Sequence, residues 1–239
     1  MNVTISFTWT TKTPLRIHTG LARAGSVDRA VRARDGRPVL PGEAVKASIR
    51  EAAERILRWQ GKNTVLEKKD SSIPTHPALF RLFAPHSAGA NSPSSSARYF
   101  YRSALASKVP DDLQNGRMEI TSTAIDDERG TSEDNMLRSF ELWRPGIQFG
   151  VTIKGTGGDW SESKPDRNDL SLLLMSIAAV DVIGGGWGIG CGELSISNLK
   201  YQIHGPVTES EVNAVFPDSP YVKAVIDAIE SDVAAEASV

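Results

Sequence analysis

The sequence is poor in cysteine, in net charge and in long apolar runs. Its single cysteine, Cys191, excludes an intramolecular disulfide and any cysteine-based zinc site, so a reducing cytoplasm is the expected compartment. The most apolar run, 170–183, is shorter than the ~20 residues that a membrane span requires, and Asp181 interrupts it. The first ten residues lack the pattern of a signal peptide. These absences predict a soluble cytoplasmic protein with no membrane partner.

Motifs for nucleotide cofactors and metal ions are also lacking. There is no Gly-Lys-Ser/Thr triplet, and the glycine-rich segment 184–192 follows a predicted helix and precedes a strand, the reverse of the Rossmann and P-loop order. The acidic run 126–134 is interpreted as a solvated loop rather than a cation site. No metal-ligand spacing relates the four histidines, which are His18, His76, His86 and His204.

The composition is that of a folded chain with an uneven distribution of charge. Of the 239 residues, 40% are hydrophobic and 23% charged, enough apolar material for a core. The net charge of −2 combines 11 Lys/Arg against 5 Asp/Glu in residues 1–60 with 1 against 7 in residues 206–239. The total therefore conceals a basic front and an acidic tail.

Hydrophobic periodicity predicts an alternation of strands and helices. Val3, Ile5, Phe7 and Trp9 alternate with polar residues as in a half-buried strand, and Pro41-Gly42 precedes a helix with one apolar face. The further predicted elements are strands at 98–107, 118–123, 140–143, 149–153 and 194–203, and helices near 166–183 and 221–229. The order β, α, β, β, α, β, with an insertion after the first helix, is the split βαβ arrangement of an α+β fold.

Six glycines lie within 184–192, although each ordered glycine costs about 0.5–1 kcal/mol relative to alanine. One interpretation is a flexible connection that follows a Schellman-type helix end. The other is a loop that packs closely against bound RNA or a neighbouring subunit. The residues alone do not choose between them.

Two N-terminal segments resemble a known protein family. Residues 14–20 (PLRIHTG) and 27–50 (VDRAVRARDGRPVLPGEAVKASIR) are similar to the signature of the RAMP superfamily of CRISPR-associated proteins, and in particular to the backbone subunit of type III effector complexes. That signature is a strand, "PLHIG", a loop with an aspartate, "RD…G.P.IPG" and a helix that opens "SLKG.LR". Weaker likenesses follow at 124–130 and 140–146, and the glycine loop lies where the family has one. One departure is Trp187, where many members carry a basic residue.

The resemblance implies a modified ferredoxin-like (RRM-like) βαββαβ palm with inserted thumb and loop elements. A single domain would span 1–239. The palm would comprise about 1–60, 97–105 and 139–204, the insertion about 61–96, and the acidic helix and tail about 206–239. The thumb tip has no signature that would number it. The hypothesis for the tail is a place away from the RNA groove, at the outer face or a subunit contact.

The resemblance also implies a function. Copies of the subunit stack into a helical filament along CRISPR RNA, beside other effector subunits, and the guide pairs with target RNA. In catalytic members an aspartate on the loop after the first strand cleaves the target at regular intervals, with Mg²⁺ or another divalent cation. That position falls on Asp28, which is the candidate catalytic residue and a possible metal ligand. No organic cofactor is expected.

The basic front provides candidate RNA contacts, since phosphate neutralisation is the main sequence-independent term in nucleic-acid affinity. Lys46 and Arg50 are four residues apart and form one stripe near the helix start. The full set of candidates is Arg16, His18, Arg29, Arg32, Arg34, Lys46, Arg50, Gly185, Gly186, Trp187 and Gly188. The alternative for the arginines is a solvated basic face, and for Asp28 an ion pair with one of them.

Other interpretations stay open. Within the family, the chain could be a purely structural backbone subunit. Outside it, the alternatives are a stand-alone endoribonuclease that processes CRISPR transcripts, which would usually need two ferredoxin-like halves, and a small-molecule enzyme, for which no triad is visible. Asp35 competes with Asp28, but Gly36 beside it suggests a turn. Trp59 and Trp143 are predicted in the core, and Tyr99 and Tyr101 are ambiguous.

Overall fold

The computed structural model describes residues 2–19, 30–59, 76–83, 98–110, 116–122, 138–156 and 164–204. Their strands are β1 (Asn2–Thr11), β2 (Ala33–Arg34), β3 (Arg37–Leu40), β4 (Tyr99–Tyr101), β5 (Ala104–Lys108), β6 (Arg117–Ser122), β7 (Arg138–Trp143), β8 (Gln148–Thr156) and β9 (Leu194–His204). The helices are α1 (Gly42–Trp59), α2 (Pro77–Phe83) and α3 (Lys164–Ala178), with a 3₁₀ turn, η1, at Trp187–Ile189. The described part thus mixes both classes, as the α+β prediction requires.

The larger sheet has the strand order β2-β3-β5-β8-β1-β9, and β4 also pairs with β8. β1 and β5 both pair antiparallel with β8, so they run parallel to each other with β8 between them. β8 and β9 likewise both pair antiparallel with β1. Each half is therefore a split βαβ unit, with α1 in the first connection and α3 in the second. This topology confirms the predicted ferredoxin-like fold.

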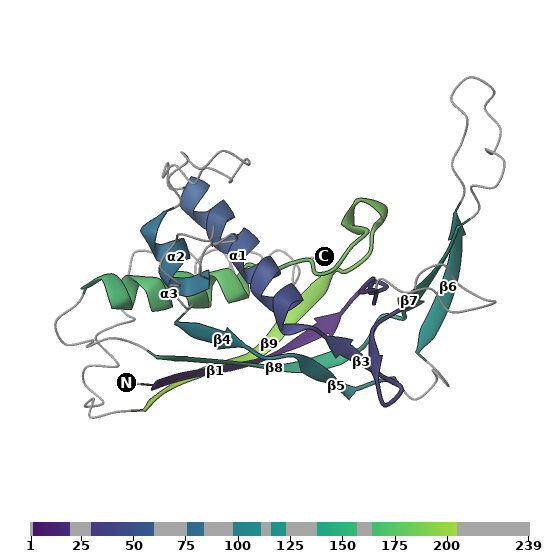
Figure 1. Ribbon diagram of the computed structural model, residues 1–239, viewed down its shortest axis with the longest axis horizontal. Coiled ribbons are helices and arrows are strands. Elements are labelled where there is room, and N and C mark those ends of the chain that lie inside the picture. Colours follow the sequence, from purple (N-terminus) through teal and green to yellow (C-terminus); the bar gives the residue numbers. More distant parts are fainter. Residues whose placement is uncertain are drawn as a thin grey trace, which may run out of the picture.

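The helices cover one face of the larger sheet (Figure 1). The predicted alternation of β1 is confirmed, because Val3, Ile5, Phe7 and Trp9 are buried beneath them. α1 buries its apolar face, including Val45, Ile49 and Ile56. Gly42 lies against the backbone of Tyr101, where a side chain would overlap the carbonyl oxygen, so α1 begins in contact with β4. The core thus fixes the direction in which α1 leaves the sheet.

Two helices differ in extent or context from the sequence pattern. α3 ends at Ala178 rather than near Ile183. α2 lies inside the predicted insertion at 61–96, where none of the helices predicted from the sequence lies. It is joined to α3 by Arg81, whose guanidinium donates to both carboxylate oxygens of buried Asp169, at 2.8 Å from Nη2 to Oδ1.

Two strand predictions need correction. The strand expected at 98–107 is two strands, β4 and β5, because the pairing with β8 is interrupted between Tyr101↔Ile153 and Ala106↔Phe149. The sequence pattern did not predict the β2–β3 hairpin, whose turn residues Asp35 and Gly36 both have positive φ, 52° and 75°. Asp-Gly is the usual pair for such a type I′ turn. The turn role suggested for Asp35 is confirmed.

β6 and β7 form a separate two-stranded sheet. Figure 1 shows this hairpin standing away from the larger sheet, beyond β3 and β5. The range proposed for the palm from 139 includes β7, which pairs with β6 from Arg117↔Trp143 to Ser122↔Arg138 and not with the larger sheet. Trp143 is nevertheless bridged to Leu15, so the base of the hairpin is held to the segment after β1.

The predicted acidic loop at 126–134 and the C-terminal helix at 221–229 lie outside the described residues. Among the helices of the described segments, none combines the length and apolar character needed to cross a membrane.

Candidate nucleic-acid interface

The glycine loop, residues 184–192, is docked on the segment that follows β1. The amide of Gly185 donates to the carbonyl of Arg16 at 2.9 Å, and the amide of Gly192 donates to the carbonyl of Pro14 at 2.8 Å. A third bond, from the Ile183 amide to the Gly192 carbonyl at 2.9 Å, closes the base of the loop. The loop is therefore a fixed element, and the interpretation as a flexible connection is wrong for its base.

The glycines at the base are required by close backbone contacts. Gly184 has φ +85°, and a Cβ there would lie 2.6 Å from the carbonyl oxygen of Arg16. Gly192 has φ +88°, and its Cβ would overlap the carbonyl oxygen of Ile183. At the apex the situation is reversed, because a Cβ on Gly188 would meet nothing within 4 Å. The apex is thus open to a ligand, while the base holds it in place.

Arg16 lies between the glycine loop and the β6–β7 hairpin. Its Cδ would be 3.1 Å from a Cβ on Gly186, so the glycine permits this contact. Its guanidinium lies over the ring of Phe140, 4.4 Å from the ring centroid. The His18 ring stacks on the same aromatic ring at a centroid distance of 6.0 Å. Arg16, Phe140 and His18 form one group that we call the Arg16 stack.

His18 and Glu141 connect the chain just before residues 20–29 to the chain just after them. Nε2 of His18 lies 3.0 Å from the carbonyl oxygen of Glu141. The Glu141 carboxylate, in a residue only 5% exposed, accepts from the Val31 amide at 3.0 Å and from Arg117 at 3.4 Å. Since the Thr19 amide also donates to the Ala30 carbonyl at 3.0 Å, the two ends of the intervening segment are joined.

Asp28 and Arg29 lie outside the described residues. Asp28 precedes Ala30 by two residues in the sequence, and Ala30 is the described residue whose carbonyl accepts from the Thr19 amide. Of the described residues, no group of three His, Cys, Asp or Glu side chains is placed to hold a metal ion. Glu141, the carboxylate at this junction, already accepts two hydrogen bonds. The described residues therefore do not form a divalent-cation site.

The predicted basic stripe on α1 is smaller than the sequence suggests. Arg50 is paired with Glu54, Nε to Oε1 at 2.8 Å, and its side chain is only 12% exposed. Partial burial, and then the positive charge of Arg50, lower the pKa of Lys46. Both causes mean that Lys46 is a poorly compensated cation, which an approaching phosphate would stabilise. Lys46 is thus the better phosphate ligand of the two.

The other predicted arginines lie on the β2–β3 hairpin. Arg34 is highly exposed, and its Nε lies 4.0 Å from the carboxylate of Asp35. Arg32 is exposed as well, while its carbonyl accepts the Trp143 indole N–H at 3.2 Å. The hairpin therefore presents cations to solvent and is attached by its backbone to the base of β7.

The aromatic predictions have mixed outcomes. Trp143 is in the core as predicted, 1% exposed, and the ambiguous Tyr99 and Tyr101 are buried too. The prediction for Trp59 is wrong, because its side chain is 76% exposed. Trp59 ends α1 two positions after Leu57, the last buried residue of the helix, and the Arg55 guanidinium lies 6.0 Å from its ring. Phe140 was missed as a site residue, and only its place in a strand was apparent from the sequence.

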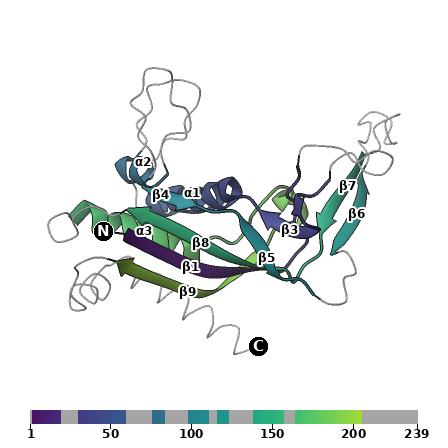
Figure 2. The ribbon, with the colours of Figure 1, turned by 60° about the horizontal axis from the view of Figure 1, so that its bottom comes forward.

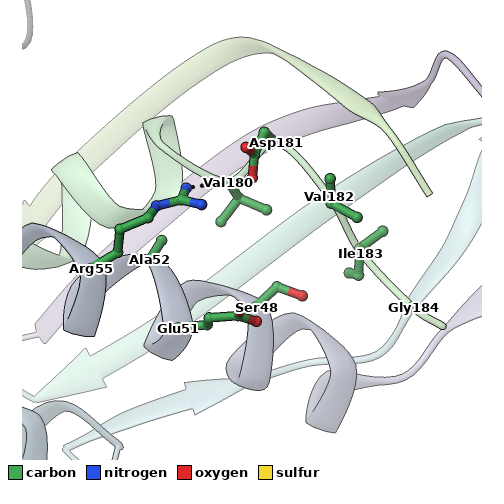
Figure 3. Close-up of a pocket in the computed structure, with 9 residues that line it drawn as sticks. All are labelled: Ser48, Glu51, Ala52, Arg55, Val180, Asp181, Val182, Ile183 and Gly184. Carbon is green, nitrogen blue, oxygen red and sulfur yellow. Dashed lines mark hydrogen bonds and ion pairs between the residues drawn. The ribbon is translucent and has the colours of Figure 1, made fainter. Parts of the chain in front are cut away.

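A cavity of about 270 Å³ lies between α1 and the chain that leads into the glycine loop (Figure 3). Arg55 and Asp181 point toward one another across it, with Nη2 and Oδ1 3.4 Å apart, and Glu51 adds a second carboxylate. Two carboxylates against one guanidinium do not suit a phosphate. Ser48 also lines the cavity, which contains no histidine or cysteine.

A ferredoxin-like sheet with a docked glycine loop, exposed arginines and an arginine–aromatic stack at one end defines a nucleic-acid-binding domain. A family model for the RAMP superfamily matches residues 8–195, most of the 239-residue chain. The chain therefore belongs to the RAMP superfamily, whose members bind RNA and act in CRISPR complexes with other subunits. No curated protein matches the chain.

Proposed function

We propose that this chain is the backbone subunit of a type III CRISPR effector complex, and that copies of it bind CRISPR RNA in a filament and cleave the paired target RNA at regular intervals. One arrangement supports the proposal above all. The glycine loop, the Arg16 stack and the joined ends of the Asp28 segment meet at the same end of the sheet. A single stretch of RNA backbone can therefore meet binding and catalytic groups together.

The β6–β7 hairpin suits the role of the thumb. It stands away from the larger sheet, while its base is held by the Leu15–Trp143 bridge and by Glu141 (Figure 2). A hairpin fixed at its base and projecting outward can enter a duplex and displace a base pair. The displaced nucleotide is then free to take the geometry that cleavage requires.

The proposed reaction uses the RNA's own 2′-hydroxyl. That oxygen attacks the adjacent phosphorus, the bond to the 5′-oxygen breaks, and the products carry a 2′,3′-cyclic phosphate and a 5′-hydroxyl. The Asp28 carboxylate accepts the 2′-hydroxyl proton, and a solvent water molecule gives a proton to the departing 5′-oxygen. Arg16 stabilises the charge that develops on the phosphoryl oxygens, since its guanidinium is already oriented by Phe140. A divalent cation, when bound, would supply further charge stabilisation to the phosphate.

The test is to assemble the full chain on a guide RNA and add complementary RNA with Mg²⁺. We expect regularly spaced products from the parent and none from Asp28→Asn, with guide binding retained. Asp35→Asn is the matched control, because it removes an exposed carboxylate in the nearby turn and asparagine tolerates positive φ. Absence of cleavage by the parent, with guide and target still bound, would establish the non-catalytic structural subunit instead.

A second measurement addresses guide binding on α1. We expect Lys46→Glu to reduce guide affinity about tenfold or more at low salt, because it removes one phosphate contact and adds repulsion. Arg58→Glu is the control, since it makes the same charge change near the far end of the same helix. Equal effects of the two variants would contradict a specific role for Lys46.

A further inference from the structure

The face of the larger sheet opposite the helices is polar and free of carboxylates. On β1 the residues that alternate with the core are Asn2, Thr4, Ser6, Thr8 and Thr10. The five strands β1, β4, β5, β8 and β9 contain no aspartate or glutamate at any position. In Figure 2 the helices lie on the other side of this sheet. Any charge on this face is consequently positive.

Two lysines of this face lie in the half of the sheet where β1 begins, and Lys108 of β5 lies toward the other end. Lys154 of β8 is the register partner of both Thr4 and Phe100, and Lys200 of β9 is the partner of Ser6. No carboxylate in the part of the chain that the structure describes pairs with Lys154 or Lys200. Phe100 is 65% exposed. We call Lys154, Lys200 and Phe100 the cationic open face.

The cationic open face includes a depression of about 580 Å³. It is lined by Asn2, Thr4, Arg98, Phe100, Lys154 and Thr156, among others. The Arg16 stack and the glycine loop follow the opposite end of β1, beyond Thr11. The cationic open face is therefore distinct from the interface proposed for the guide RNA.

The chain itself supplies a segment of opposite charge at this place. β9 ends at His204, the register partner of Asn2, so residues 205–239 start from the edge of the cationic open face. Residues 206–239 hold seven acidic residues against one lysine. Glu209 and Glu211 follow His204 by five and seven residues, a reach of about 17–23 Å for an extended chain. Lys154 is two strands from β9, about 10 Å away, and is within that reach.

We propose that the acidic C-terminal segment, residues 206–239, binds the cationic open face of its own sheet and keeps RNA from binding there. The covalent connection gives the segment an effective concentration in the millimolar range, which a free polyanion must exceed. The centre of the face carries threonine and serine, and the cationic open face has a single aromatic side chain, Phe100, whereas single-stranded RNA stacks on several successive aromatic platforms. The tethered acidic segment is therefore favoured over RNA as the occupant.

Disulfide trapping in the full chain tests the proposal. The pair Ser6→Cys with Ser210→Cys places one thiol on the open face and one beside the first acidic residues. The control pair is Ala47→Cys with Ser210→Cys, since Ala47 is exposed on the helical face. The native Cys191 is buried and does not compete. At low salt, we expect the first pair to form an intramolecular disulfide about fivefold faster, or more, than the control pair. This difference in rate should disappear in 0.5 M NaCl, and also when Lys154→Glu and Lys200→Glu are added to the first pair.

Three results would overturn the proposal. The first is an equal rate of disulfide formation in the two cysteine pairs, or a rate for the first pair that Lys154→Glu and Lys200→Glu leave unchanged. The second is trapping that appears mainly as covalent dimers and grows with protein concentration, which would assign the face to a second copy. The third is weaker RNA binding by Lys154→Glu, Lys200→Glu in the absence of trapping, which would assign the face to RNA.

Discussion

Replacement of Gly192 by alanine tests whether the glycine loop is a built structural element. Gly192 has φ +88°, a conformation that costs an L-residue about 1–2 kcal/mol. Its Cβ would also overlap the carbonyl oxygen of Ile183, so the loop base must shift. The hydrogen bonds at risk join Gly192 to Ile183 and Pro14, each contributing about 1 kcal/mol. Together these terms predict a loss of about 2–4 kcal/mol in the free energy of unfolding.

The matched control is Gly188→Ala in the same loop. Gly188 lacks a positive φ, and an added Cβ meets nothing within 4 Å. Alanine there should leave stability unchanged or raise it by about 0.4–1 kcal/mol, because the unfolded chain loses freedom. In thermal unfolding, the melting temperature of Gly192→Ala should lie about 5–15 °C below that of Gly188→Ala. Similar melting temperatures for the two variants would refute the argument that the loop base is sterically constrained.

Two further predictions concern charged side chains outside the loop. Asp169→Ala removes the buried partner of Arg81, so urea unfolding should show a loss of about 2–4 kcal/mol in the free energy of unfolding. The double variant Arg81→Met with Asp169→Leu should recover most of this stability. If it recovers none, the argument from the ion pair is wrong. Folding lowers the pKa of Lys46 from its ordinary value of 10.5. Between the pKa of the folded protein and 10.5, the unfolded chain therefore binds more protons than the folded one, and the free energy of unfolding rises with pH. The difference in stability between the parent and Lys46→Met should show that rise, and a flat difference across the window would refute it.

Local patterns predicted most of the elements correctly. The alternation in β1 and the 3.6-residue spacing in α1 arise from the one-sided burial of each element, so they are legible in the residues. The Asp35-Gly36 turn was recognised, but the hairpin that it closes was missed because β2 has only two residues. Trp59 was misplaced because periodicity does not determine where a helix leaves the core.

The candidate site was predicted by residue type but not by arrangement. Arg16 and the glycine loop were both proposed from sequence, 168 or more positions apart, yet nothing local indicated that the Arg16 carbonyl accepts from Gly185. Phe140 and Glu141 lie in the weaker likeness at 140–146, which assigned them no role in the site. They became site residues only because the β6–β7 hairpin is held against the segment after β1.

What the sequence by itself determined is the order of elements, the superfamily signature and the separation of a basic front from an acidic tail. These are properties of neighbouring residues, and neighbours are set by the chain. What only the tertiary structure decided is which charges are available. Arg50 is paired with Glu54, whereas Lys154 and Lys200 lie on a face whose strands have no carboxylate. Charge compensation depends on distances between residues remote in sequence, and those distances exist only in the folded chain.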